Sequence, residues 1–238
     1  MATKTRTNMY ANVKTWNPFV GCNHDCVYCD ASFQRQLKRW AKSNCKACYN
    51  FTPHYHPDRL RRLPSAETIF VCGNGDIAFC ETSFIEKIVD RITEHYARSP
   101  EKTYYFQSKN WASASRLLPL LEDKPFNAII LETLETNRDE GYRRISKAPM
   151  PSQRHKTFLE LNHLRKVITA EPLLDFDVDV FFEMIAKTEP EYVWIGYNSK
   201  PALISLPEPT LDKTKQLIKL LKSSGLEVRG KELRGLTV

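Results

Sequence analysis

The 238-residue sequence contains no apolar run long enough to cross a lipid bilayer. Its first residues, Met1 to Arg6, are mostly polar, and the apolar core of a secretion signal does not follow them. Internal repeats, low-complexity tracts and linker-like stretches are also missing. These absences argue against a membrane-spanning or secreted protein, and they predict one domain over residues 1–238 in the cytoplasm.

The chain has seven cysteines, so it also lacks the even number that a complete set of disulfide bonds requires. Five of them fall into two close groups. Cys22, Cys26 and Cys29 follow a C-x3-C-x2-C pattern, and Cys45 and Cys48 follow a C-x2-C pattern. Without a secretion signal, such groups indicate metal binding in a reducing compartment rather than disulfide bonds.

The first cysteine group favours an iron–sulfur cluster, because thiolates bind soft metals and usually hold such clusters. Three local thiolates would bind three irons of a four-iron cluster and leave the fourth iron open. An open coordination site is where chemistry takes place, as at catalytic zinc. One alternative is a structural zinc site with His24 or a distant residue as the fourth ligand, and another is a disulfide pair.

The second group is followed by two histidines. Cys45, Cys48, His54 and His56 have a spacing compatible with a Cys2His2 zinc site. A second iron–sulfur cluster that recruits Cys72 or Cys80 is one alternative. Two free cysteines and two surface histidines are the other.

Short β-forming runs alternate with stretches of helical periodicity. Helices are predicted around residues 84–92, 117–121, 158–164, 181–185 and 217–221. Strands are predicted at Trp16–Val20, Thr68–Cys72, Thr103–Gln107, Ala128–Glu132, Val167–Ala170, Tyr192–Gly196 and Leu226–Arg229. This alternation predicts parallel strands with right-handed crossovers, and therefore an α/β fold of the partial (β/α)6-barrel type. A basic insertion with cysteine and histidine, at about residues 33–66, interrupts the rhythm.

Ligands of parallel α/β folds bind at the carboxyl ends of the strands, and polar or small residues follow the predicted strands here. Small residues let a ligand approach the backbone, Asp76 could accept hydrogen bonds from an ammonium group, and Lys109 could pair with a carboxylate. The candidate residues at these ends are Gly73, Asn74, Gly75, Asp76, Lys109, Glu132, Thr133, Glu171, Gly196 and Tyr197.

Three runs along the chain carry a family resemblance: WNPFVGC at residues 16–22 with the cysteines that follow, AEPLL at 170–174, and WIG at 194–196. They resemble small, often phage- or mobile-element-associated radical S-adenosylmethionine (SAM) proteins and, more distantly, the spore photoproduct lyase branch. The resemblance covers nearly the whole chain. It implies a [4Fe–4S] cluster on Cys22, Cys26 and Cys29, with SAM on the open iron and reductive cleavage to a 5′-deoxyadenosyl radical that abstracts hydrogen from a substrate.

The same resemblance implies roles for the strand ends. Residues 73–76 would contact the amino group of SAM, Glu132 and Thr133 would contact the ribose, and residues 170–171 and 195–197 would flank the adenine. Cys80, which follows the Asp76 loop, is a candidate hydrogen donor to a substrate radical, and Lys109 is the second candidate catalytic residue. An electron donor such as flavodoxin or ferredoxin would reduce the cluster.

The net charge of +7 favours an anionic partner. Lysines and arginines gather at residues 35–62, together with aromatic residues, and again at 138–154, and such surfaces suit nucleic acids. We therefore expect a nucleic acid, nucleotide or nucleobase as substrate, with the segments Phe33–Arg62 and Thr136–Arg154 over the open end of the barrel. A small metabolite or peptide is one alternative. A non-enzymatic zinc-containing nucleic-acid-binding or adaptor module, with a partner encoded nearby, is another.

Overall fold

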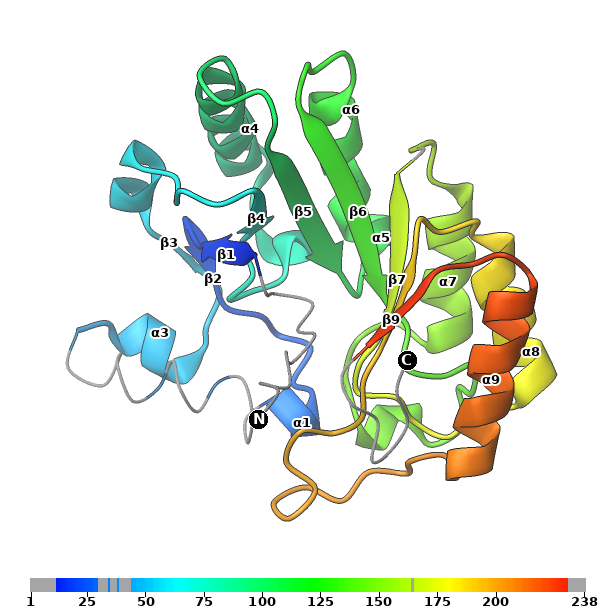
Figure 1. Cartoon of the computed structure of the whole chain (residues 1–238). Helices are drawn as coiled ribbons and strands as arrows, with labels where there is room; N and C mark the ends of the chain where they lie inside the picture. Colours follow the sequence, from blue (N-terminus) through cyan, green and yellow to red (C-terminus); the bar gives the residue numbers. More distant parts are fainter. Residues whose placement is uncertain (1–11, 30–33, 35–37, 39–43, 164, 231–238) are drawn as a thin grey trace, which may run out of the picture.

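The computed structural model describes residues 12–29, 34, 38, 44–163 and 165–230. Its main feature is one curled, seven-stranded parallel sheet in the order β1-β4-β5-β6-β7-β8-β9 (Figure 1). The strands are β1 (Val13–Trp16), β4 (Thr68–Val71), β5 (Thr103–Ser108), β6 (Asn127–Thr133), β7 (Lys166–Ala170), β8 (Val193–Ile195) and β9 (Val228–Gly230). The predicted α/β partial barrel is thereby confirmed.

Helices form the crossovers between successive strands on the outer side of the sheet (Figure 1). They are α4 (Thr82–Tyr96), α5 (Trp111–Ala114), α6 (Leu118–Leu121), α7 (Pro151–Glu160), α8 (Val178–Lys187) and α9 (Leu211–Ser223). In α4, Phe84, Ile85, Ile88, Val89 and Ile92 are buried because helical spacing puts them on one face. The α7 helix ends earlier than its sequence pattern suggests, and Leu164 lies outside the described residues. Among the described helices, none is both long and apolar enough to span a bilayer.

The two faces of the sheet carry different parts of the core because side chains alternate along each strand. The outer face packs against the helices in one large apolar cluster that includes Ile69, Phe106 and Ile130. The inner face carries Phe70, Tyr105, Ile129, Leu131, Val167, Tyr192 and Trp194. Polar residues that continue the inner rows at the strand ends therefore point into the barrel.

The predicted first strand, Trp16–Val20, is wrong in one respect, because the structure divides it in two. Only Trp16 of this run belongs to β1, where it pairs with Val71 of β4. After Pro18, which has no backbone N–H for a ladder, Phe19 and Val20 form β2 and pair antiparallel with β3 (His54–Tyr55). The described part of the insertion also contains α3 (Lys46–Asn50) and a 3-10 helix at Pro57–Arg61. Residues 33, 35–37 and 39–43 of the predicted insertion lie outside the described residues.

Candidate active site

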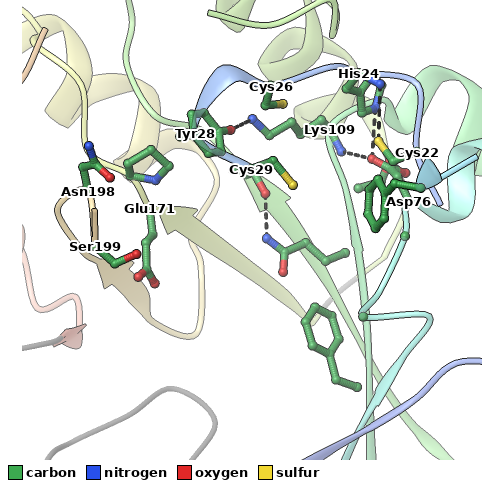
Figure 2. A pocket seen from close by; sticks show the side chains of 18 of the residues that line it. Cys22, His24, Cys26, Tyr28, Cys29, Asp76, Lys109, Glu171, Asn198 and Ser199 are labelled. Atoms are coloured by element: carbon green, nitrogen blue, oxygen red, sulfur yellow. Dashed lines mark hydrogen bonds and ion pairs between the residues drawn. The ribbon is translucent and has the colours of Figure 1, made fainter. Parts of the chain in front are cut away.

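A cavity of about 260 Å³ opens at the carboxyl ends of the strands, just below the usual range of about 300–1,000 Å³ for small-ligand sites. All three cysteines of the first group line it, and their side chains extend from the loop around α1 (Val27–Cys29) (Figure 2). Strand-end residues from distant parts of the chain complete the wall, among them Gly73, Gly75, Asp76, Gln107, Ser108, Lys109, Thr133, Glu171, Tyr197, Asn198 and Ser199. The cavity therefore brings the cysteine group and the strand ends together.

The start of the cysteine loop is bound to the end of β4 through its backbone. Gly21 donates its N–H to the Asn74 carbonyl oxygen at 3.0 Å and accepts from the Asp76 N–H at 3.2 Å. Gly21 and Gly75 must both be glycine at this contact, because any side chain would collide with a backbone oxygen. A Cβ on Gly21, whose φ is +100°, would lie 2.3 Å from the Thr52 carbonyl oxygen, and a Cβ on Gly75 would lie 2.7 Å from the Gly21 oxygen.

The other side of the cysteine loop contacts the segment around residues 145–147. Val27 donates its N–H to the Ile145 oxygen at 2.9 Å, and Lys147 donates to the His24 oxygen at 2.7 Å. The Ser146 hydroxyl lies 3.1 Å from the Cys26 Sγ. The loop predicted to lie over the open end of the barrel thus packs directly on the cysteine loop, which is held between it and β4.

Asp76 has a positioning role in this arrangement. Its Oδ2 accepts from the Lys109 N–H at 2.9 Å and lies 3.0 Å from the His24 Nε2. Its Oδ1 accepts from the Ser108 hydroxyl at 2.7 Å and from the Ala78 N–H at 2.9 Å. Burial acts to raise the pKa of Asp76, but the contacts with His24, the Lys109 N–H and the Ser108 hydroxyl together lower it. With four partners, this carboxylate fixes the loop and is poorly placed to accept the ammonium group predicted for it.

A second buried carboxylate, Glu135, lies between two cations. It accepts hydrogen bonds from the Lys109 Nζ and the Arg154 guanidinium, from the Tyr28 hydroxyl at 2.6 Å and from the Tyr142 hydroxyl at 3.1 Å. Burial acts to raise the pKa of Glu135, but Arg154 and Lys109 lower it to about 2. The sequence predicted a carboxylate partner for Lys109, and in the structure that partner belongs to the protein itself.

The residues expected around an adenine adopt three different roles. Glu171 lines the cavity and accepts a hydrogen bond from the Trp194 Nε1 at 2.6 Å. Gly196 does not line the cavity, but a Cβ there would lie 2.8 Å from the Glu171 Cδ, so this glycine makes room for that side chain. Tyr197 lines the cavity, while its hydroxyl bonds the Thr214 hydroxyl of α9 at 2.6 Å.

Besides Gly196, three predicted site residues do not reach the cavity. Glu132 precedes Thr133 on β6, and alternation turns its carboxylate to the outer face, 3.0 Å from the His155 Nδ1 of α7. Asn74 is used through its backbone, with its N–H donated to the Asn17 Oδ1 at 2.7 Å. Cys80 is fully buried in the outer core, so the structure gives no geometric basis for a hydrogen-donor role.

Sequence reasoning missed several residues that the structure places at the site. Gln107 lines the cavity and donates to the Thr133 hydroxyl at 2.6 Å and the Thr169 hydroxyl at 3.0 Å. Its position two residues from Tyr105 on the inner face was a usable signal. Tyr28, Ser199 and Arg154 carried no comparable signal, because their roles depend on contacts between distant segments.

The second cysteine group is also brought together. The ligand atoms of Cys45, Cys48, His54 and His56 all lie within 4.8 Å of one another. The other such group in the described part of the chain is Cys22, His24 and Asp76, which does not include Cys26 or Cys29. Cys22, Cys26 and Cys29 are thus spread along a cavity wall, whereas the ligand atoms of Cys45, Cys48, His54 and His56 lie close enough together to surround a single ion.

The donor set of the first group fits a cluster with one open iron. The three thiols are all half-buried and line one cavity. No further cysteine among the described residues lines it. A zinc site with all three cysteines and His24 is not favoured, because the ligand atoms that converge with His24 are those of Cys22 and Asp76, and Cys26 and Cys29 are not among them. The rest of the cavity wall, polar and partly glycine, leaves room for a ligand beside the cysteines.

One solved structure similar to this chain is that of SuiB from Streptococcus suis, bound to the precursor peptide SuiA. The similarity has a TM-score of 0.58 at 10% sequence identity and covers 92% of this chain. The chain spans about half the length of that protein, since 48% of it is covered. No family model and no curated protein sequence matches the chain. The likeness shows that the two chains share a fold.

Proposed function

We propose that this chain is a radical SAM enzyme with a [4Fe–4S] cluster on Cys22, Cys26 and Cys29. The observation that carries the proposal is the meeting of these three thiols and the strand ends of a curled parallel sheet at one cavity. When bound, such a cluster would supply the electron that cleaves SAM to methionine and a 5′-deoxyadenosyl radical, after reduction by a donor such as flavodoxin or ferredoxin.

The protein's own residues would bind and orient the cosubstrate. Gly73 and Gly75 line the cavity beside the cysteines, where a Cβ would lie 2.9 Å from the Phe70 side chain and 2.7 Å from the Gly21 oxygen, respectively, so glycine lets this wall pack closely. The Gln107 amide donates to two threonine hydroxyls, so it offers its carbonyl oxygen to a ligand. Lys109 and Arg154 share one buried carboxylate, Glu135, and their ion pairs would hold the Lys109 side chain in place at the cavity wall.

Anaerobic reconstitution tests the proposal. We expect about four irons per chain, the absorption of an iron–sulfur cluster, and 5′-deoxyadenosine formed only with both SAM and a reductant. Cys22→Ala/Cys26→Ala/Cys29→Ala should lose the iron and the product. Cys80→Ala is the matched control, because this buried cysteine lies outside the cavity and its loss should leave both unchanged. Full iron loading of the triple variant would overturn the assignment of ligands.

For the substrate, we propose a nucleic acid, nucleotide or nucleobase. The net charge of +7 supports an anionic substrate. Several cations of the 138–154 group are used within the fold, as in the pairs of Arg138 with Asp175 and Asp177. Arg144 and Lys147 remain exposed on the segment that contacts the cysteine loop. A peptide is the alternative, in view of the peptide in the SuiB structure.

A non-enzymatic module is the second candidate function, and the compact group of two cysteines and two histidines favours it. In that case, protein purified without oxygen would be colourless, contain zinc alone and bind no SAM. A brown protein that binds SAM would exclude this candidate.

A further inference from the structure

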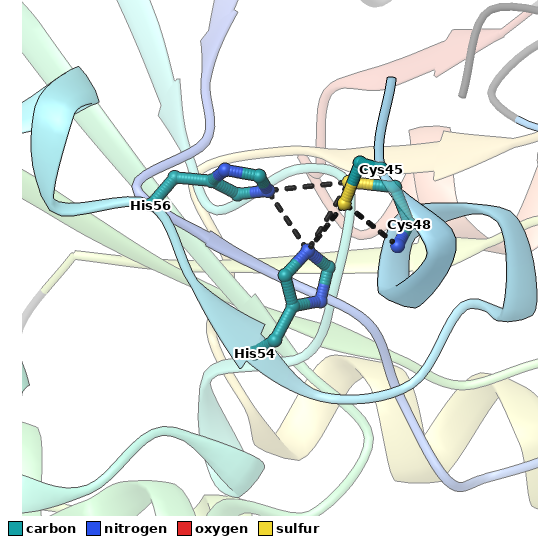
Figure 3. A group of neighbouring side chains, drawn as sticks. All are labelled: Cys45, Cys48, His54 and His56. Atoms are coloured by element: carbon teal, nitrogen blue, oxygen red, sulfur yellow. Dashed lines mark hydrogen bonds between the residues drawn. The ribbon is translucent and has the colours of Figure 1, made fainter. Parts of the chain in front are cut away.

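The side chains of Cys45, Cys48, His54 and His56 converge on one point (Figure 3). The Cys48 Sγ lies 3.1 Å from the His54 Nε2 and 3.2 Å from the His56 Nε2, and the Cys45 Sγ lies 3.4 Å from the His54 Nε2. Around tetrahedral zinc, with bonds of about 2.3 Å to sulfur and 2.0–2.1 Å to nitrogen, neighbouring ligand atoms are about 3.3–3.8 Å apart. The four atoms are therefore close to the arrangement that one such ion requires.

Two contacts orient these side chains. The His54 Nδ1 lies 2.6 Å from the Thr52 carbonyl oxygen, so that nitrogen carries the proton and Nε2 is left to accept a metal. The Cys45 Sγ accepts the Cys48 N–H at 3.1 Å, where Cys45 caps the first turn of α3. Both contacts would hold the ligands in place without a further protein group.

The number and the arrangement of the donor atoms argue against an iron–sulfur cluster at this second site. A four-iron cluster needs more thiolates than this point offers, because Cys72 and Cys80 are both buried in the outer core. A two-iron cluster with mixed ligands binds two cysteines on one iron and two histidines on the other. Here the Cys48 Sγ is within 3.2 Å of both histidine nitrogens, so all four donors surround a single ion.

We propose that Cys45, Cys48, His54 and His56 bind one zinc ion in a closed, structural site. This site would hold in place the backbone segments that contact the cysteine loop. Four protein donors fill a tetrahedral shell and leave no position for a substrate. His54 pairs with Val20, directly before Gly21 and Cys22. The Cys22 N–H donates to the Phe51 oxygen at 3.2 Å, between the two halves of the ligand set. The role of the zinc site in positioning the cysteine loop rests on the proposed function. The binding of zinc by these four residues does not depend on it.

Metal analysis of the anaerobically purified full chain tests the site. We expect one zinc per chain, kept in Cys22→Ala/Cys26→Ala/Cys29→Ala and lost in Cys45→Ser/Cys48→Ser. Cys80→Ala is the control and should keep its zinc. Zinc bound in less than a tenth of wild-type chains, or lost equally from the control, would overturn the proposal. Zinc without iron in the wild type would contradict the proposed function and leave this site standing.

Because the double variant could fail to fold, X-ray absorption at the zinc edge of the wild-type protein provides a second test. The expected shell has two sulfurs at about 2.3 Å and two nitrogens at about 2.0–2.1 Å. Four sulfurs, or oxygen-rich coordination, would overturn the assignment. A milder variant, His56→Asn, should release zinc to a chelator at least tenfold faster than the wild type, and an unchanged rate would contradict a role for His56 as ligand.

Discussion

The carboxylate of Glu135 is held between two cations close to the cavity. It is fully buried and pairs with Lys109 and Arg154, whose side chains are 11% and 1% exposed. Removing one partner of such a group leaves charges without compensation in a poorly solvated place. We expect Glu135→Gln to lower the free energy of unfolding by about 3–5 kcal/mol, measured by denaturant titration of chains with equal metal content.

The matched control for this variant is Glu191→Gln. Glu191 pairs with Arg165 at 2.5 Å, but both side chains are more than a third exposed. Solvent screens such pairs, so the control should cost less than about 1 kcal/mol. Equal losses in the two variants would show that Glu135 contributes no more than a surface ion pair.

The pH dependence of stability follows from the same group. The pKa of Glu135 falls from 4.5 to about 2 on folding, because of Arg154 and Lys109 and in spite of burial. The folded state therefore binds fewer protons, and the stabilisation is complete above pH 4.5 and lost as pH falls toward 2. Wild-type stability should decline more steeply through this window than that of Glu135→Gln. Parallel pH profiles would contradict the lowered pKa.

At the scale of single residues, sequence reasoning identified strand ends but not side-chain directions. Thr133 lines the cavity and Glu132 does not, although the two are neighbours. Alternation along β6 decides between them, and it could have been applied to the sequence, because Ile129 and Leu131 define the inner row. The second partner of Glu135, Arg154, lies 19 residues away on α7, and no local pattern points to it.

At the scale of elements, the cysteine loop depends on its close approach to β3 and β4. Gly21→Ala would bring a Cβ to 2.3 Å from a backbone oxygen of Thr52, which no rotamer change can relieve. We expect this variant to lose about 3 kcal/mol or more of unfolding free energy. It should also retain less iron after reconstitution, measured by iron analysis after gel filtration.

Gly225→Ala is the control for this prediction. Gly225 has a similar positive φ of +85°, but a Cβ there would meet nothing within 4 Å. Its replacement should cost only the backbone penalty of the left-handed region, about 1–2 kcal/mol, and leave the iron content unchanged. If both variants behave alike, backbone conformation alone accounts for Gly21 and the close contact has no separate role.

For the whole molecule, the repeating pattern was sufficient to predict the sheet. Each crossover helix has one apolar face and each strand a short apolar run, so the parallel partial barrel follows from local periodicity. The division of the first strand could not be predicted in this way. It depends on the pairing of Phe19 and Val20 with His54 and Tyr55, more than 30 residues later in the chain. Likewise, the spacing of the second cysteine group suggested a metal site, and only the fold shows that its four side chains converge.

The net charge of +7 leads to a prediction about the substrate. Arg144 and Lys147 are exposed beside the cysteine loop, and the pair of Lys147 with Asp25 is too exposed to hold the lysine strongly. We expect Arg144→Gln/Lys147→Gln to weaken binding of a single-stranded oligonucleotide, measured by fluorescence anisotropy over a range of salt concentrations. The slope of log K against log salt should become shallower by about 1.4, the value for two lost phosphate contacts on a single strand.

The control replaces two exposed lysines of α9, Lys219→Gln/Lys222→Gln, and changes the net charge equally. If the anionic substrate is attracted only by overall charge, both double variants should weaken binding to the same extent, because distant charges act through the summed field of the protein. If it lies across the cysteine loop, the Arg144/Lys147 variant alone should change the salt slope, while 5′-deoxyadenosine formation without substrate persists in both. Binding of the wild type that is independent of salt would remove the nucleic acid from consideration and favour a peptide or small molecule.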